Sequence, residues 1–574
     1  MLRASKQADR LLALLDAAKN NFTPGQARRI AELLNKLSAI EFTDPHQLIR
    51  FHEILLFLRA FPHARSHVRR IESLLDTFRR RVEKLRELDP DMSVFDDFDT
   101  SGIAGTTMQD MLSFDVAKWL TQSIPRNVEI AWNDYWDDYG SERARGNTWP
   151  RFIPLLEEDA EVEANIPWQR WLDAARGREP SLQWLLRRFD QLPLALRQRS
   201  ELYDSLRFPI RWRLENLKLS RTRNWKSPRR WYFHDAPLIQ RNEVSLAREL
   251  SRPAPELERL SLAEGESIMQ AIREIMVVRY RELYGTTLGD PRSVVRADLG
   301  RGVVMHFWGL PPSRRLPLRA YLAGYTLKNG VPINYIEATG LCECIEVGFN
   351  TFYTYRQGET AWIYAQALRC LRALTGATTM SIYPYQIGQN NDEAIDSGAF
   401  WFYRKLGFRS GRRDLQKVCE REEQRIAANP KYRTPPHILK NLAEAHMFYE
   451  LDSANDKPSW ETFSTRNLGL RINRRMAQHF HGDSDKLRAS STASVARSLR
   501  IKPSKWTPLQ RQSLENWALV LALIPDLARW SPGEKRQLIE IIRSKSSSDE
   551  MLFLHQTQHH PRLRSELLRL GSKV

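Results

Sequence analysis

Apolar residues recur every three or four positions through the first ninety residues of the chain. Residues 30–37 and 54–58 show the pattern clearly, with most of their apolar side chains on one side of a predicted helix. This follows because an α-helix turns once every 3.6 residues. Asp44-Pro45 interrupts the pattern as a capping residue followed by proline, which is typical of a helix start. Residues 1–90 are therefore predicted to form a helical bundle.

Helical spacing continues in residues 91–259, which are rich in tryptophan. Residues 114–184 hold seven tryptophans, and prolines mark the turns between the predicted helices. Tryptophan rings in a helical region most often lie at helix crossings, although they can also line a binding groove. We expect a Trp-rich helical region here, ending in a basic and aromatic segment at residues 207–231.

The pattern changes after residue 260, where β-rich runs begin to alternate with helical ones. The predicted elements, in order, are a helix at 267–283; strands at 303–308, 319–327, 333–338 and 344–355; a helix at 362–374; a strand beginning at Thr379; and a helix at 391–408. Asn329-Gly330 between the second and third strands is a strong β-hairpin signal.

Residues 413–574 return to helical spacing. The stretch at residues 490–504 is rich in serine and basic residues, and we expect it to be a linker. The predicted fold class is α+β, with a central mixed sheet and flanking helices at residues 260–412. This sheet region is embedded between N-terminal and C-terminal all-helical domains.

A short loop at residues 356–361 lies between the fourth predicted strand and the following helix. It reads Arg356-Gln-Gly-Glu-Thr-Ala361. The first backbone N–H groups of a helix have no partner within the helix, and the helix dipole makes this end positive. A loop in this place can therefore hold a diphosphate.

Two further pieces follow about thirty residues later. They are Asn391-Asp-Glu-Ala394 and Tyr403-Arg-Lys-Leu-Gly407-Phe408, in which Gly407 is suited to end a helix. Together with the loop, these pieces resemble the GNAT superfamily of acyl-CoA-dependent N-acyltransferases, over residues 260–412. The chain departs from the family pattern in the longer spacing from Asn391 to Tyr403. It also has glycine at the third position of the loop and Glu359 at the fourth.

The resemblance implies that acetyl-CoA or another acyl-CoA binds here and that its acyl group passes to an amine on an unknown acceptor. The cofactor-binding residues that it implies are Arg356, Gln357, Gly358, Glu359, Thr360, Ala361 and Asn391. Tyr403 matches the position at which the superfamily often keeps its general acid. Glu337, Glu343 and Glu346 are candidates for the general base, and a structural salt bridge is an equal alternative for each.

Glu359 leaves a second function open. A carboxylate beside a diphosphate is unfavourable unless its side chain turns away. The alternative is therefore a catalytically degenerate GNAT-like fold that serves as a nucleic-acid-binding or scaffold protein.

Charge adds a possible second partner to this picture. The formal net charge is +18 and the isoelectric point is about 9.8, which favours acidic partners. Residues 207–231 combine nine lysines and arginines with four aromatic residues and a single acid, Glu215. Cations beside aromatic rings are typical of a nucleic-acid contact surface. A surface docked onto acidic segments of the same chain is the competing interpretation.

The remaining motifs add no cofactor. Cys342 and Cys344 lack further ligands at zinc spacing, and the acidic cluster at residues 96–99 lacks the glycine and glutamate of a calcium loop, so no metal site is expected. The chain has no apolar run of eighteen residues, and its start reads as an amphipathic helix rather than a signal peptide. We therefore expect a cytoplasmic protein with reduced thiols and no membrane span.

Overall fold

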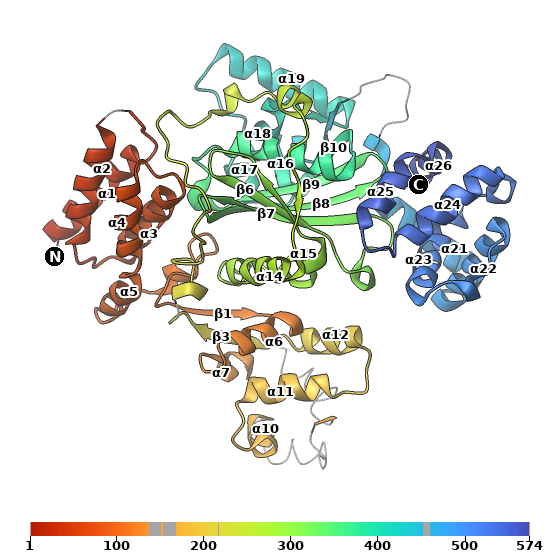
Figure 1. The fold of residues 1–574 in the computed structure, drawn as a ribbon, viewed down its shortest axis with the longest axis horizontal. Helices are drawn as coiled ribbons and strands as arrows, with labels where there is room; N and C mark the ends of the chain where they lie inside the picture. Colours follow the sequence, from red (N-terminus) through yellow and green to blue (C-terminus); the bar gives the residue numbers. More distant parts are fainter. Residues whose placement is uncertain are drawn as a thin grey trace. The chain divides into compact units, whose positions relative to one another are not determined.

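The computed structural model describes residues 2–23, 25–136, 151–152, 168–215, 217–451 and 460–572. The chain divides into two compact units, whose elements are labelled in Figure 1. The first unit comprises residues 1–227, 233–237 and 270–287, and the second comprises residues 228–232, 238–269 and 288–574. Among the described helices, none has both the length and the apolar character needed to cross a lipid bilayer.

The first unit begins with the predicted helical bundle. Its helices are α1 (Leu2–Ala18), α2 (Gln26–Ser38), α3 (Pro45–Ala60), α4 (Arg65–Leu75) and α5 (Phe78–Arg86). Asp44 caps α3, since its carboxylate accepts a hydrogen bond of 2.9 Å from the backbone N–H of His46. The Asp44-Pro45 signal is thus confirmed as a helix start.

The rest of the first unit contains a small antiparallel sheet that the sequence pattern did not predict. Its elements are β1 (Thr107–Met111), β2 (Val128–Ile130) and β3 (Pro209–Arg213), with helices α6 (Phe114–Ser123), α7 (Trp132–Trp136), α10 (Trp168–Arg176), α11 (Ser181–Asp190) and α12 (Leu196–Leu206). β3 lies between β1 and β2. Its apolar positions, Ile210 and Trp212, are buried in the core with Trp119 and Trp184. The prediction of an all-helical region was wrong. The strands have only three to five residues, which is too short for a clear alternation of apolar and polar positions. Trp149 lies outside the described residues.

The second unit is built on a large mixed sheet. Its strands in the described residues are β4 (Glu258–Arg259), β5 (Val295–Asp298), β6 (Val303–Trp308), β7 (Ala320–Lys328), β8 (Val331–Leu341), β9 (Cys344–Thr351), β10 (Thr379–Ile382), β11 (Arg409–Ser410) and β12 (Met447–Glu450). They lie in the order β11-β12-β10-β9-β8-β7-β6-β5-β4. Neighbouring strands are antiparallel except β9 and β10, which are parallel.

The predicted hairpin joins β7 to β8. Asn329 and Gly330 have positive φ angles of 47° and 80°, as a two-residue hairpin turn requires. The three strands predicted around this turn are confirmed to within a few residues as β6, β7 and β8. The fourth predicted strand, β9, ends at Thr351, where a 3₁₀ turn, η7 (Tyr353–Tyr355), begins.

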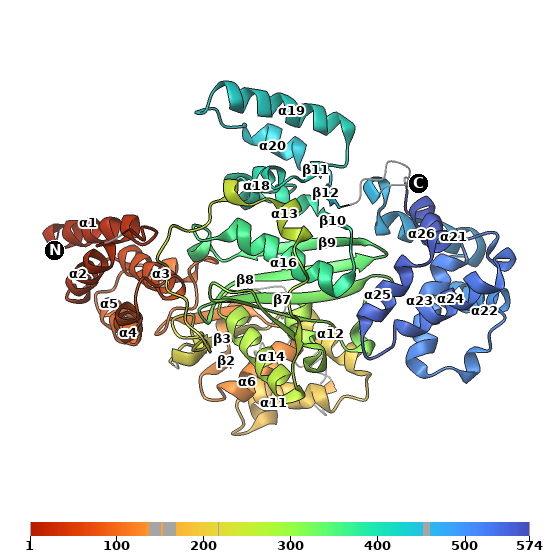
Figure 2. The same cartoon turned by 45° about the horizontal axis from the view of Figure 1, so that its top comes forward.

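Helices cover the sheet, and along the chain they come before, between and after its strands. Those of the second unit that precede β11 are α13 (Leu246–Ser251), α16 (Thr360–Thr375), α17 (Asp392–Asp396) and α18 (Ala399–Lys405). The helix α14 (Leu262–Val277) begins in the second unit and ends in the first, and α15 (Tyr284–Leu288) belongs almost wholly to the first. In both ribbon views α16 and α18 lie on the same side of β8 and β9 (Figures 1 and 2), and Figure 1 shows α17 on that side as well. The single helix predicted at 391–408 is two short helices, because Gly398 breaks it with a φ of 69°.

The C-terminal part is mostly helical, but it also supplies a strand of the large sheet. Its helices are α19 (Arg413–Ala428), α20 (Pro436–Leu442), α21 (Thr465–Phe480), α22 (Ser484–Leu499), α23 (Pro508–Leu521), α24 (Pro532–Ser544), α25 (Glu550–Gln558) and α26 (Pro561–Gly571). This part is not purely helical, since it supplies β12, which pairs with β10 in the large sheet. Most of the linker expected at 490–504 is instead helix: residues 490–499 are the second half of α22, and residues 500–504 form the turn that follows it. The buried Leu487, Ser491 and Val495 of α22 recur every four residues.

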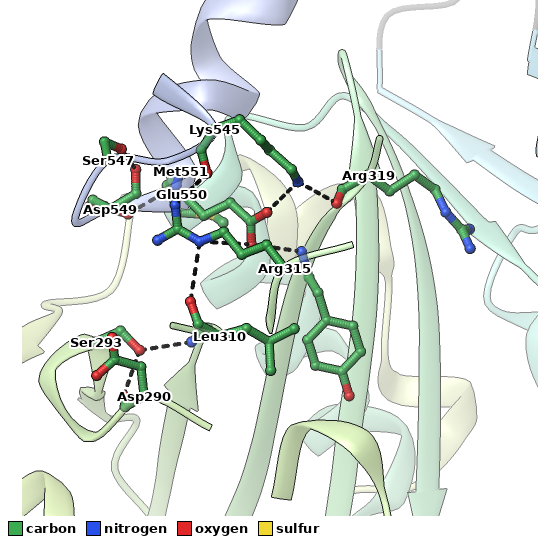
Figure 3. Close-up of polar contacts among 12 residues, drawn as sticks. Asp290, Ser293, Leu310, Arg315, Arg319, Lys545, Ser547, Asp549, Glu550 and Met551 are labelled. Carbon is green, nitrogen blue, oxygen red and sulfur yellow. Dashed lines mark hydrogen bonds and ion pairs between the residues drawn. The ribbon is translucent and has the colours of Figure 1, made fainter. Parts of the chain in front are cut away.

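A buried ion cluster fastens this helical part to the sheet. Figure 3 shows Glu550, the first residue of α25, beside Lys545 and beside Arg315 in the loop between β6 and β7; the Lys545 side chain is directed toward Glu550 and the carbonyl oxygen of Arg319. Lys545 pairs with Glu550 and donates a hydrogen bond of 2.7 Å to the carbonyl oxygen of Arg319. Arg315 donates one of 2.6 Å to the carbonyl oxygen of Lys545. All three side chains are buried, so the cluster is inside the second unit.

Candidate functional site

The parallel pair β9 and β10 separates after three residues. Cys344, Ile345 and Glu346 pair with residues 379–381, but β9 continues to Thr351. The chain after β10 turns instead into a 3₁₀ turn, η8 (Pro384–Ile387). The strands therefore open a notch beyond Glu346, on the edge of β9 that faces away from β8.

A cleft of about 610 Å³ lies at this notch, a size within the usual range for small-molecule sites. Its lining includes eight of the eleven residues that the resemblance implied. They are Glu337, Arg356, Gln357, Gly358, Thr360, Ala361, Asn391 and Tyr403. Glu343, Glu346 and Glu359 are not among its lining residues. The cleft is enclosed by the strand edge, the start of α16, α17 and α18, and a strap at residues 239–241.

The start of α16 presents backbone N–H groups to the cleft. No described residue accepts a hydrogen bond from the backbone N–H of Thr360 or Ala361, and both residues line the cleft. The N–H of Gly358, in contrast, donates to the carbonyl oxygen of Tyr355 over 2.9 Å. The amides without an acceptor in the described residues are therefore those of the first helical turn, where a helix can receive an anion.

Glu359 points away from the cleft. Its side chain is fully buried, where it pairs with Arg301 and, over 3.1 Å, with Lys328, and it accepts a hydrogen bond from the backbone N–H of Ile239. Burial lowers the pKa of Lys328 to about 8, while the carboxylate of Glu359 acts in the opposite direction. The Glu359 carboxylate is thus paired with two buried or half-buried cations, and its side chain does not line the cleft.

Arg356 is, with Arg241, one of two arginines among the described residues that line the cleft. It forms an ion pair with Glu393 of α17, which also lines the cleft, and its guanidinium lies 5.6 Å from the ring centroid of Tyr353. Asn391 caps α17, since its side chain accepts a 3.2 Å hydrogen bond from the N–H of Ala394. Its amide nitrogen donates to the carbonyl oxygen of Tyr385.

Tyr403 places a phenol in the cleft. Its ring is buried and meets the ring of Tyr364 edge-on at 5.5 Å. Its hydroxyl makes one long contact, 3.4 Å to the Oε1 of Gln386. Burial raises the pKa of Tyr403 above its ordinary value, so the phenol keeps its proton at neutral pH.

Glu337 is the candidate base that the structure brings into the cleft. It lies on β8 opposite Gly348 of β9 and accepts a hydrogen bond from the hydroxyl of Tyr321. Burial raises the pKa of Glu337, and the Tyr321 hydrogen bond works in the opposite direction. A carboxylate with a raised pKa is a better proton acceptor than an ordinary glutamate.

The other two candidate glutamates are engaged in ion pairs elsewhere. Glu343, in the turn between β8 and β9, pairs with Arg564 and accepts a 2.8 Å hydrogen bond from the indole of Trp460. Glu346 pairs with Arg319 at 3.3 Å and with His446 at 3.1 Å. Although burial opposes it, the pKa of each carboxyl is lowered by these partners. The salt-bridge interpretation therefore suits both.

Two important residues of the notch were missed from the sequence. Gln386 reaches across it, and a Cβ added at Gly348 would lie 2.6 Å from the Nε2 of Gln386. An isolated glycine within a strand is a signal of such a close approach, and it could have identified this position. Gln240 and Arg241 also line the cleft, but nothing in their local sequence connects them with a site more than a hundred residues later.

The basic and aromatic segment at 207–231 is used largely for structure. Phe208 and Trp212 are buried in the core of the first unit. Arg211 pairs with Asp134, Arg221 with Glu53 and Arg223 with Asp76. These ion pairs with acids of the same chain favour the competing interpretation of a docked surface. Since Phe208 and Trp212 are buried, their rings cannot stack on bases.

Comparisons with known proteins add no relative. No family model, no curated protein and no solved structure matches the chain. In the described residues, the four cysteines are free, and no group of three or more His, Cys, Asp or Glu side chains could hold a metal ion. The chemistry of the cleft must therefore be inferred from its own residues, and the chain is a mixed α/β protein without an identified family.

Proposed function

We propose that the protein is an acyl-CoA-dependent N-acyltransferase of the GNAT type, which transfers an acyl group to an amine on an unidentified acceptor. The observation that carries this proposal is the coincidence of the notch, the start of α16 and Tyr403 in a single cleft. The motifs that resemble the superfamily lie far apart in sequence, yet their residues line the same cavity.

The cleft fits the anionic part of an acyl-CoA. The N–H groups of Thr360 and Ala361 and the guanidinium of Arg356 are the groups that would receive the diphosphate. With Glu359 paired behind the helix, the unfavourable carboxylate is removed from this position. Beyond Glu346, β9 has no neighbouring strand on this edge in the described residues, so its backbone groups could pair with the amides of an extended ligand. The N–H of Phe349 on this edge donates to the Oε1 of Gln386 over 3.4 Å, so a ligand would have to displace that side chain there.

Acyl-CoA would supply an acyl group activated as a thioester. Glu337 is placed to accept the proton that the amine loses when its nitrogen forms the new amide bond. Tyr403 is placed to donate its phenolic proton to the departing sulfur, and burial keeps that proton in place until then. Together the two residues move one proton from the amine side and one to the thiolate side, so charge balances over the transfer.

A thermal-shift screen with acetyl-CoA and longer acyl-CoAs tests this function. A ligand at one hundred times its Kd stabilises a protein by about 2.7 kcal/mol, which is a measurable rise in Tm. We expect such a rise with at least one acyl-CoA, followed by amide formation when amines are supplied. The absence of any shift at millimolar acyl-CoA would remove the proposal.

A further inference from the structure

In one segment of the C-terminal helices, all of the charged side chains are positive. Residues 486–514 contain seven lysines and arginines and no aspartate or glutamate. They form most of α22, a 3₁₀ turn η10 (Pro503–Lys505) and the first half of α23. On some other helices an exposed arginine is matched by an acid one turn away, as Arg28 is by Glu32 and Arg197 by Glu201.

Four of the seven cations have neither an ion pair nor a side-chain hydrogen bond with the described residues. Lys486 pairs with Asp483, Arg488 donates to Asn516, and Arg511 donates to the carbonyl oxygen of Trp506. The remaining four are exposed and form no ion pair or side-chain hydrogen bond with any described residue. We name them the basic corner: Arg497, Arg500, Lys502 and Lys505.

The backbone under the basic corner is ordered and held by buried side chains. Arg500 ends α22 with a positive φ of 57°, and the N–H of Ile501 donates back to the carbonyl oxygen of Ala496 over 3.0 Å. Leu499 and Trp506 are buried on either side of the turn. The four cations are therefore displayed on a fixed connection between two packed helices, not on a linker.

The composition of the corner favours a polyanion over a folded protein partner. Protein interfaces need an apolar centre, and the one aromatic ring of this connection, Trp506, is buried. Phosphate backbones need only cations and hydroxyl groups, and the exposed Ser504 lies between Lys502 and Lys505. Neighbouring like charges repel one another until an anion neutralises them.

We propose that the basic corner binds the phosphate backbone of nucleic acid without reading its sequence. No exposed aromatic side chain is present in the described residues 486–514, so base stacking does not contribute. This inference is independent of the acyltransferase proposal, since the four residues do not line the cleft.

Fluorescence anisotropy with a 30-base-pair duplex tests the proposal, over 50 to 200 mM salt. The variant carries Gln at all four positions of the corner. The control carries Gln at Arg413, Lys417, Arg421 and Arg425 of α19, a helix of mixed charge, so that the two variants lose the same net charge. For four lost phosphate contacts, the slope of log K against log salt should become shallower by about 3.6, and affinity should fall at least tenfold.

The control variant should keep the wild-type slope and affinity. The proposal is overturned if the wild-type chain shows no salt-dependent binding, or if both variants lose affinity equally. Competition by polyglutamate as effective as competition by nucleic acid of equal charge would also overturn it, in favour of an acidic protein partner. Melting temperatures of both variants establish that each one is folded.

Discussion

Two buried clusters in the second unit have the same composition, one lysine, one glutamate and one arginine, but different positions. Lys328, Glu359 and Arg301 lie behind the first turn of α16, whereas Lys545, Glu550 and Arg315 lie between the C-terminal helices and the sheet. Arg301 is 26% exposed, and the three members of the other cluster are at most 4% exposed.

The difference lies in what each cluster holds in place. Glu359 is the residue immediately before α16, so its ion pairs fix the helix end whose N–H groups face the cleft. Glu550 accepts a 3.2 Å hydrogen bond from the backbone N–H of Tyr321 at the start of β7, and it fixes the attachment of α25. The same three residue types thus position a site in one place and fasten a helical region in the other.

The largest expected effect is on the fastening cluster. Replacing Lys545 with Met leaves Glu550 buried without its closest cation, and breaking such a pair costs about 3–5 kcal/mol of the free energy of unfolding. Urea denaturation measures the loss. Lys486→Met breaks an exposed pair and should cost no more than about 1 kcal/mol. Equal losses in the two variants would contradict the role of the cluster.

Glu359→Gln distinguishes the two clusters, because only this change should affect both stability and acyl-CoA affinity. We expect a loss of about 3 kcal/mol in the free energy of unfolding, because Lys328 stays buried beside a neutral group. We also expect acyl-CoA affinity to fall, because the start of α16 is less firmly held. Glu550→Gln should reproduce the first effect without the second, as judged by calorimetry on folded protein. Unchanged affinity in Glu359→Gln would show that the cluster does not position the site.

Tyr403→Phe tests whether the hydroxyl of Tyr403 acts as the general acid in the cleft. Loss of a general acid lowers turnover by about 100-fold, while the Kd for acyl-CoA should stay the same. Tyr364→Phe is the matched control, since Tyr364 is fully buried, touches the ring of Tyr403 and does not line the cleft. If both variants keep full turnover, Tyr403 is structural.

Glu337 predicts a particular pH dependence. A base acts when deprotonated, so turnover should fall as pH drops through the pKa of Glu337, which burial raises above that of an ordinary glutamate. Tyr321→Phe removes the hydrogen bond that stabilises the carboxylate, so the acidic limb of the pH profile should move to higher pH. A limb that stays in place after this change would exclude Glu337 as the base.

The smallest effect concerns Glu393, whose carboxylate competes with a ligand diphosphate for Arg356. Glu393→Gln should tighten acyl-CoA binding by a factor of about 2–5, as expected for a partly exposed ion pair. Asp392→Asn is the control, because Asp392 pairs with Lys440 and does not line the cleft. Weaker binding in Glu393→Gln would mean that Glu393 helps to hold the ligand instead.

Much of the sheet was predictable because its signals are local. Asn329-Gly330 defined a hairpin, and the β-branched and aromatic runs beside it became β6, β7 and β8. The small sheet of the first unit was not predictable in the same way, since β2 has three residues and β3 reads as a basic segment. Its buried Ile210 and Trp212 alternate with arginines, and only tertiary packing shows which face is inside.

The candidate site was also predictable only in part. The loop before α16, Asn391 and Tyr403 were identified from motif order, and the structure brings them to the same cleft. Which glutamate shares that cleft depends on ion pairs from distant helices: Arg564 engages Glu343, and His446 engages Glu346. The orientation of Glu359 likewise depends on Arg301 and Lys328, which no local pattern connects with it.

Titration calorimetry of acetyl-CoA into the wild-type chain and into Arg356→Ala tests whether this cleft binds an acyl-CoA. We predict binding of one acetyl-CoA per chain, weakened at least tenfold by the loss of the Arg356 guanidinium from the start of α16. Acetyl-CoA that binds both proteins equally, or neither at millimolar concentration, would contradict the assignment of this cleft.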